Sequence, residues 1–300
     1  MRRPRAFRAK PDAILRSLRD PRLWLLVAAM VAGGIAAYRV PYSFTLDIGG
    51  GPGSLVYDEP YLLSGFNDDP EPDPGTEPPG AFRWAFEEAR LVFPGLGRGV
   101  YAATLRVATA RPGTAPTPSH WRSDGAPLST IPIGPAPRFY HVLLPSEGPH
   151  LDLRMSTPPF GAPGDPRPLA FGADVLHVAA LAPAAPAWPV LGWLASSVAL
   201  AYGLLRRGGI GSRLAAGIGL GLVAVLVWWL AWERLSLTGF APRLCGVLLA
   251  GYLLSSFLSS VLSSLGAAVG LSLAPREARM LTTLVVLAWI IRLGGLLHPQ

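Results

Sequence analysis

The chain has 300 residues, half of them hydrophobic, with a single cysteine and a formal net charge of +7 at pH 7. One cysteine excludes an intramolecular disulfide. Of the 32 prolines, 26 lie between Pro41 and Pro189, in a polar segment that separates two apolar regions. This division excludes a simple soluble domain and predicts an α+β membrane protein with a folded polar insert.

Residues 1–22 form a basic tail with seven arginines and one lysine against two aspartates. Because Lys and Arg beside a span are retained in the cytoplasm, the tail predicts a cytoplasmic N-terminus. The apolar run that follows predicts a transmembrane helix over residues 23–40. A cleaved signal peptide is the alternative, but the 22-residue basic region is long for one, which favours an uncleaved signal anchor.

Residues 43–182 are expected to form an extracytoplasmic antiparallel β-sandwich. Short alternating segments are separated by Pro and Gly turns; in the clearest one, Tyr101, Ala103, Leu105 and Val107 would share a buried face. Regularly spaced short strands of this kind are typical of two-sheet sandwiches. From 43 to 181 the segment holds 15 acidic residues against nine arginines, which argues against nucleic acid as a partner.

The acidic loop between Gly65 and Gly80 raises the question of a metal. Asp68, Asp69 and Asp73 lie there without any basic residue, and calcium prefers such oxygen ligands. Their spacing matches no known calcium loop, and the loop's prolines suit a stiff solvated segment, so no metal is expected.

Three aromatic residues of the head, Phe66, Trp84 and Trp121, are candidates for stacking on a sugar ring. Aromatic residues in a sandwich more often belong to the core, so only exposed ones would be informative.

Residues 188–297 predict a membrane domain of four more helices, giving about five spans in all. Arginines follow the second and fourth spans, at 206, 207, 213, 276 and 279, where a cytoplasmic N-terminus requires cytoplasmic loops. We therefore expect a multi-pass protein of the plasma membrane with its head outside. The expected helices cover residues 188–205, 214–232, 244–266 and 280–297.

The fourth span carries six serines that form one small, weakly polar stripe on a helix. Small residues and hydroxyl groups favour helix–helix packing over a substrate path. The stripe comprises Ser255, Ser256, Ser259, Ser260, Ser263 and Ser264.

Arg292 is the one charge set well within a predicted span. A charge there is costly, so Arg292 either extends to the interface or faces a cavity that could hold an anionic lipid phosphate; the first is favoured.

Three short motifs carry a family resemblance: Gly65-Phe66, Phe82-Arg83-Trp84, and Asp165 to Leu169 with the sequence DPRPL. With the flanking spans they resemble the N-terminal part of large bacterial membrane proteins related to lipid-linked-sugar glycosyltransferases. The resemblance implies a jelly-roll-like head similar to carbohydrate-binding modules. Ala85 and Ala170 depart from the motifs, which commonly have Thr and Gly there. Asp165 and Arg167 match them and suggest a paired brace or ligand contact.

The resemblance implies a head that binds glycan or lipid-linked sugar, within or beside a membrane glycosyltransferase system. The alternative is a non-catalytic assembly protein whose head binds a protein partner, including other membrane proteins. Enzyme activity stays open: the one carboxylate in the membrane-proximal loops of the second half is Glu233, and its neighbour Arg234 favours a surface ion pair. The chain ends at Gln300, shortly after the last predicted span, which fits a truncated product or a non-catalytic relative.

The arginine distribution yields the first testable prediction, which concerns topology. A reporter that is active only outside the cytoplasm, fused after residue 100, is expected to be active, because the first span delivers the head outside. A reporter active only in the cytoplasm should be silent there and active after residue 209. The opposite pattern at residue 100 would contradict the topology.

Overall fold

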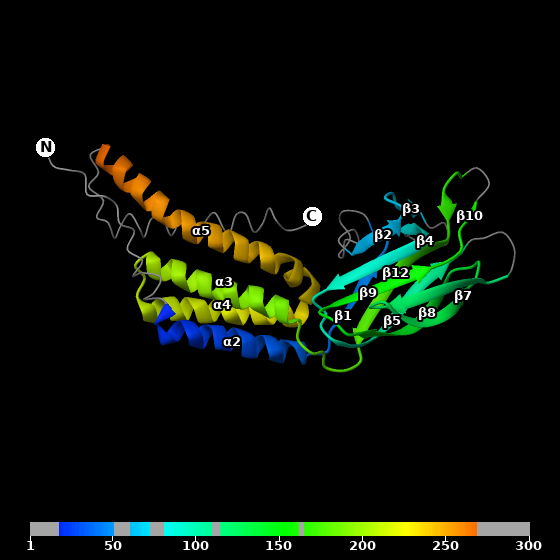
Figure 1. Cartoon of the computed structure of the whole chain (residues 1–300), viewed down its shortest axis with the longest axis horizontal. Coiled ribbons are helices and arrows are strands. Elements are labelled where there is room, and N and C mark those ends of the chain that lie inside the picture. Colours follow the sequence, from blue (N-terminus) through cyan, green and yellow to red (C-terminus); the bar gives the residue numbers. More distant parts are fainter. Residues whose placement is uncertain (1–17, 51–60, 73–80, 110–114, 162–164, 269–300) are drawn as a thin grey trace. The chain divides into compact units, whose positions relative to one another are not determined.

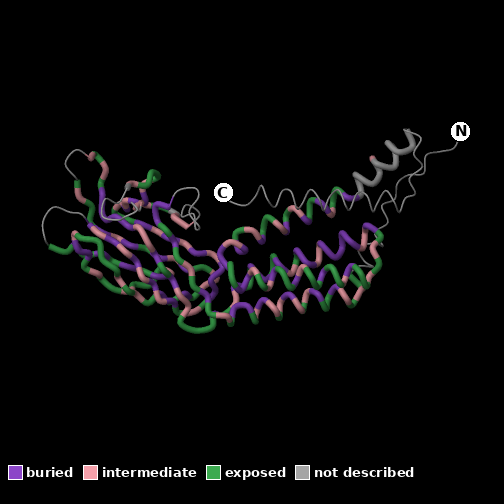
Figure 2. The backbone as a smooth tube through the Cα atoms, turned by 180° about the vertical axis from the view of Figure 1, so that it is seen from behind, coloured by how far each residue is buried: buried purple, intermediate pink, exposed green. Residues whose placement is uncertain are grey.

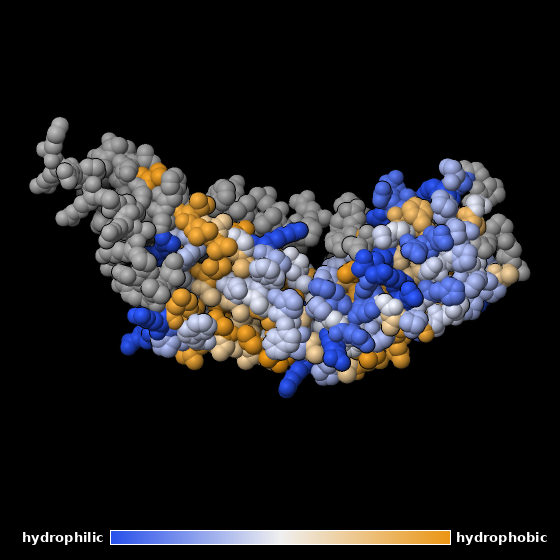
Figure 3. All heavy atoms as spheres, in the orientation of Figure 1, coloured by the Kyte–Doolittle hydropathy of each residue, from blue (hydrophilic) through white to orange (hydrophobic). Residues whose placement is uncertain are grey.

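The computed structural model describes residues 18–50, 61–72, 81–109, 115–161 and 165–268, and the chain forms two compact units. Helices build one unit. The other, the head, consists of Ile35–Pro189 together with Leu230–Thr238. Figure 3 shows hydrophobic residues gathered over the helices and hydrophilic residues over the head.

Four described helices are long and apolar enough to cross a membrane (Figure 1). The expected fifth span, 280–297, and Arg292 lie outside the described residues. The last described helix begins at Arg234 instead of Leu244, so the expected loop before it is helical and contains Pro242. The helices are α2 (Pro21–Tyr38), α3 (Trp188–Arg207), α4 (Ser212–Trp232) and α5 (Arg234–Ala268).

Glycines let the helices of the first unit approach closely. A Cβ atom added at Gly33 of α2 would lie 2.6 Å from Val227 of α4, and one at Gly34 would lie 2.4 Å from Leu191 of α3. Ser255 is buried and donates to the carbonyl of Tyr252; the side chains of the other five stripe serines lie outside the described part. Close packing through small residues is the usual basis of helix association in membranes.

The head is an antiparallel sandwich of two sheets joined along one seam. One sheet has the order β8–β5–β12–β1, and the other β7–β6–β9–β4–β2, with the short β3 beside β4. The seam forms where Phe171–Ala173 of β12 pair with Arg83–Ala85 of β4. The first sheet comprises β1 (Ser43–Asp47), β5 (Gly99–Ala108), β8 (Arg138–Ser146) and β12 (Phe171–Ala180). The second comprises β2 (Leu62–Phe66), β3 (Glu71–Pro72), β4 (Ala81–Pro94), β6 (Thr117–Ser123), β7 (Ala126–Ile133) and β9 (His150–Ser156). A separate pair joins β10 (Phe160–Gly161) to β11 (Pro168–Leu169).

Buried residues alternate with more exposed ones along the strands of the head (Figure 2). The predicted inward face of β5 is confirmed, because Tyr101, Ala103, Leu105 and Val107 are each at most 1% exposed. Leu151, Leu153 and Met155 of β9, in the other sheet, are similarly buried. The sandwich expected from the period-two pattern is therefore present.

Arg234 is fully buried within the head unit. Its guanidinium lies 4.3 Å from the ring centroid of Tyr38 and 4.9 Å from that of Tyr42. It donates hydrogen bonds to the carbonyls of Ala37, at 3.1 Å, and Leu96, at 3.3 Å. The expected surface ion pair with Glu233 is therefore wrong: the cation is held by aromatic faces and carbonyl oxygens.

Arg234, Tyr38 and Tyr42 form a cage that contacts the turn between β4 and β5. Gly95 and Gly97 both have positive φ angles there. Tyr38 donates to the carbonyl of Gly95 at 2.7 Å, and Tyr101 to those of Leu96 and Gly97. Burial raises the pKa of Tyr101 to about 12, so this phenol is neutral and gives Arg234 no counter-charge.

The cage yields a second prediction. Arg234→Ala is expected to lower the free energy of unfolding by about 2–4 kcal/mol, because it opens a cavity beside two tyrosine rings and removes one hydrogen bond from each of two buried carbonyls. Arg234→Lys should recover only part of the loss, since an ammonium cannot stack flat and donate as a fork. Thermal unfolding of the full chain in detergent measures both. Arg213→Ala, at an exposed position near the start of α4, is the control, and an equal loss there would contradict a special role for Arg234.

Candidate functional site

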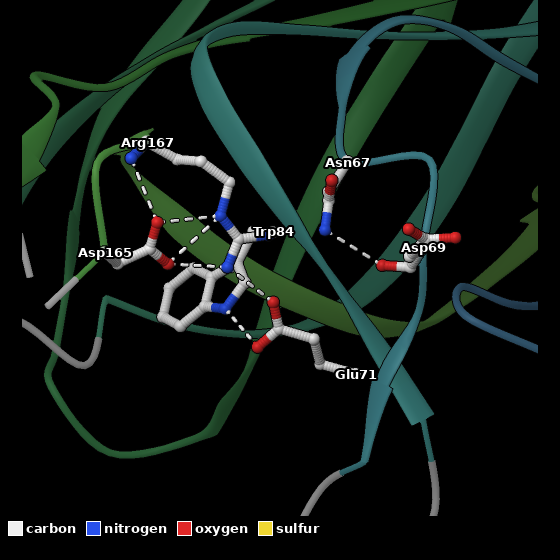
Figure 4. A network of polar contacts seen from close by, with 6 residues as sticks. All are labelled: Asn67, Asp69, Glu71, Trp84, Asp165 and Arg167. Carbon is white, nitrogen blue, oxygen red and sulfur yellow. Dashed lines mark hydrogen bonds and ion pairs between the residues drawn. The ribbon is translucent and has the colours of Figure 1, made fainter.

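Trp84 on β4 lies in a cluster of polar side chains that includes Glu71, Asp165 and Arg167 (Figure 4). Its indole Nε1 donates to Glu71 Oε2 at 3.0 Å. The other oxygen of Glu71 accepts from Arg167 at 2.7 Å. Glu71 reaches Trp84 because β3 pairs with the start of β4, where Glu71 lies opposite Phe82. Two of the predicted site residues, Trp84 and Arg167, are thus linked through a carboxylate that the sequence pattern had assigned to the acidic loop.

Asp165 holds Arg167 in place by accepting four hydrogen bonds from it, three of them from the guanidinium. The guanidinium donates to both carboxylate oxygens at 2.5–3.0 Å, and the backbone N–H of Arg167 donates to Asp165 Oδ1 at 2.9 Å. These bonds lower the pKa of Asp165 to about 2. The expected ion pair between the two residues is therefore present, and it extends to Glu71.

Two aromatic rings fix the indole from its sides. Phe82 meets Trp84 edge to face, with ring centroids 5.3 Å apart, and Phe160 of β10 does so at 6.3 Å. Trp84 is half-buried, so part of the indole stays open to solvent. A hydrogen bond and two T-shaped contacts leave the ring little rotational freedom.

Phe66 and Trp121 do not join this cluster. Trp121 is 1% exposed and donates to Ser119 Oγ inside the sandwich, and Phe66 is 9% exposed. Both are core residues, which does not support a stacking role for either ring.

The acidic loop shows no calcium site among the residues that the structure describes, where no group of three potential ligands converges. Arg83 is buried and donates to the carbonyls of Asn67 and Asp68. A guanidinium beside these oxygens repels a second cation, so Asp68 and Asp69 are poorly placed as ligands. Asp73 lies outside the described residues.

The second sheet carries a polar groove of about 670 Å³ on its outer face. Hydroxyl and charged side chains of β2, β4, β6, β7 and β9 line it, among them Ser64, Glu88, His120, Thr130 and Ser156. None of these residues stands out in the sequence, because they meet only through strand pairing.

No model of a known protein family matches the chain, and no curated protein matches it. Solved structures are similar to the head at low identity. The C-terminal CBM6 of LamC, a marine laminarinase from Zobellia galactanivorans, matches 46% of this chain and 98% of its own at 12% identity and a TM-score of 0.29. A family 35 carbohydrate-binding module from Clostridium thermocellum matches 46% of this chain and 97% of its own, at 10% identity and a TM-score of 0.31. The ANXUR1 extracellular domain of Arabidopsis thaliana matches 49% of this chain and 51% of its own, at 14% identity and a TM-score of 0.32.

The Asp165 pKa yields a third prediction, on acid stability. Since the folded-state value is depressed from 3.8 to about 2, the ion pair stabilises the head fully above the ordinary value and loses its effect as pH falls towards 2. Asp165→Asn should therefore lower the unfolding midpoint at pH 7 and make little difference near pH 2. Asp69→Asn, an exposed carboxylate nearby, is the control. A constant difference at all pH values would contradict the assignment.

Proposed function

We propose that the head is a glycan-binding domain attached to the membrane, with the Trp84 cluster as its contact surface. The observation that carries this proposal is a partly exposed indole fixed at the end of a carboxylate–guanidinium–carboxylate chain. Sugar rings present an apolar C–H face and hydroxyl groups at their edges, and such a cluster offers a partner for each.

The polar groups of the cluster keep capacity for a ligand. A carboxylate has about four acceptor positions, and Glu71 uses one oxygen for Trp84 and the other for Arg167. The four acceptor positions of Asp165 are occupied by hydrogen bonds from Arg167, so Glu71 is the acid that keeps free positions. Sugar hydroxyls would donate to the free lone pairs of Glu71 while the ring lies against the indole.

The membrane helices give this binding a location. The basic tail favours a cytoplasmic N-terminus, and the first helix then carries the head to the outer side. A head held there would bind glycan or lipid-linked sugar at the membrane surface, within or beside a glycosyltransferase system. This last step rests on the motif resemblance, and the four helices support only membrane attachment.

The alternative, a protein-binding head, is favoured by a different observation. The outer face of the first sheet exposes Phe139 at 58%, Leu143 at 60% and Val100 at 43%. Exposed large apolar side chains suit a protein partner. The two functions use different residues of the head and can therefore be tested separately.

A fourth prediction tests the proposed function. The purified full chain is screened on a glycan array, and the best ligands are titrated by calorimetry. Trp84→Ala should weaken binding by about threefold to tenfold, because an aromatic contact contributes ~0.5–1.5 kcal/mol. Phe139→Ala is the matched control and should bind glycan normally. Absence of binding at millimolar ligand, with a folded head, would rule out the glycan function and favour the protein partner.

A further inference from the structure

Three arginines stand in one row across neighbouring strands of the second sheet. Arg122 of β6 lies opposite Arg154 of β9, and Arg154 lies opposite Arg90 of β4. All three side chains are on the outer face, because the residues beside them, such as Trp121, Leu153 and Ala89, are buried. With strands about 4.8 Å apart, the row spans about 10 Å.

This row is unfavourable for the sheet by itself. Like charges directly opposite one another destabilise a strand pair. The row contains three of the nine arginines in residues 43–181. The same segment has 15 acidic residues, enough to give each arginine a carboxylate partner. A cluster of positive charge on an otherwise acidic head indicates a site that binds an anion.

Internal compensation of the row is incomplete. Asp152 accepts two hydrogen bonds from Arg90 at 2.9 Å and is also paired with Arg154 at 3.0 Å. Burial opposes ionisation of Asp152, but these bonds keep its pKa below the usual value. Arg122 has no ion pair within the described part of the chain and is exposed. One carboxylate therefore serves two arginines, and the third faces solvent.

The row lies within the polar groove. Arg90, Arg122 and Arg154 line it together with a single acid, Glu88. The remaining polar lining consists of hydroxyls and an imidazole, including Ser129, Thr130 and His120, which hydrogen-bond neutral hydroxyl groups well. The groove therefore combines fixed positive charge with partners for a hydroxyl-rich ligand.

We infer that this groove binds the acidic units of a glycan, with Arg122 and Arg154 contacting carboxylate or sulfate groups on the sugars. The inference rests on the proposed function and adds a ligand class and a second contact surface to it. Guanidinium groups recognise carboxylates and sulfates through paired, charge-assisted hydrogen bonds. A nucleic acid fits less well, because Asp152 and Glu88 beside the row and the acidic head as a whole repel a continuous phosphate backbone.

The test compares acidic ligands with neutral ligands of the same backbone. Oligogalacturonate is paired with its methyl ester, and dextran sulfate with dextran, in titrations of the full chain in detergent. The acidic member should bind at least about tenfold more tightly at low salt, and this advantage should shrink as salt rises. Which of the two pairs shows the advantage separates carboxylate from sulfate recognition.

Variants tie the effect to the row. Arg122→Gln should remove most of the acidic advantage without changing the unfolding midpoint, since its side chain has no ion pair to lose among the described residues. Arg138→Gln, an exposed arginine on β8, is the matched control and should bind like the unaltered chain. Trp84→Ala should weaken acidic and neutral ligands alike.

Each contrary outcome has a distinct meaning. Equal affinity for acidic and neutral ligands, with Trp84→Ala still weakening both, would overturn the acidic groove and leave the proposed function standing. No binding of any glycan would overturn both. If a short DNA duplex binds as tightly as the acidic glycan, and Arg122→Gln abolishes this binding, the surface recognises negative charge alone. That result would overturn the glycan assignment of the groove.

Discussion

The buried cation of Arg234 connects parts of the head that are far apart in the sequence. Its guanidinium lies against Tyr38 and Tyr42, and its hydrogen bonds reach Ala37 and the turn at Leu96. A buried charge without a carboxylate partner is tolerated only where aromatic faces and carbonyls replace its hydration. Together with the hydrogen bonds from Tyr38 and Tyr101, this contact holds the turn between the end of β4 and the start of β5.

Strand β4 relates the two proposed contact surfaces to each other. Trp84 and Arg90 lie six residues apart on this strand, a distance of about 20 Å along an extended backbone. The seam with β12 holds the Trp84 end, and pairing with β9 holds the Arg90 end. A rigid strand therefore sets the separation of the indole from the arginine row, and a ligand that contacts both must be extended.

Local patterns predicted the sandwich, and non-local pairing explains what they missed. The alternation from Tyr101 to Val107 identifies a strand because the buried face repeats every second residue. Asp165 and Arg167 are two residues apart, so their ion pair can be read directly. Glu71 meets Trp84 only through the β3–β4 register, and the arginine row exists only once three strands are paired. Arg234 looked exposed because a charged residue between two apolar runs usually marks a loop.

The composition of the head unit has a consequence for the order of events during synthesis. The last strand of the sandwich ends at Ala180, but the segment Leu230–Thr238 that completes the unit follows two whole helices later. At about 5–20 residues per second, the ribosome reaches Arg234 several seconds after the strands are complete. Until then the Arg234 side chain is absent from its place beside Tyr38 and Tyr42. The head unit is therefore completed only after α3 and α4 have been synthesised.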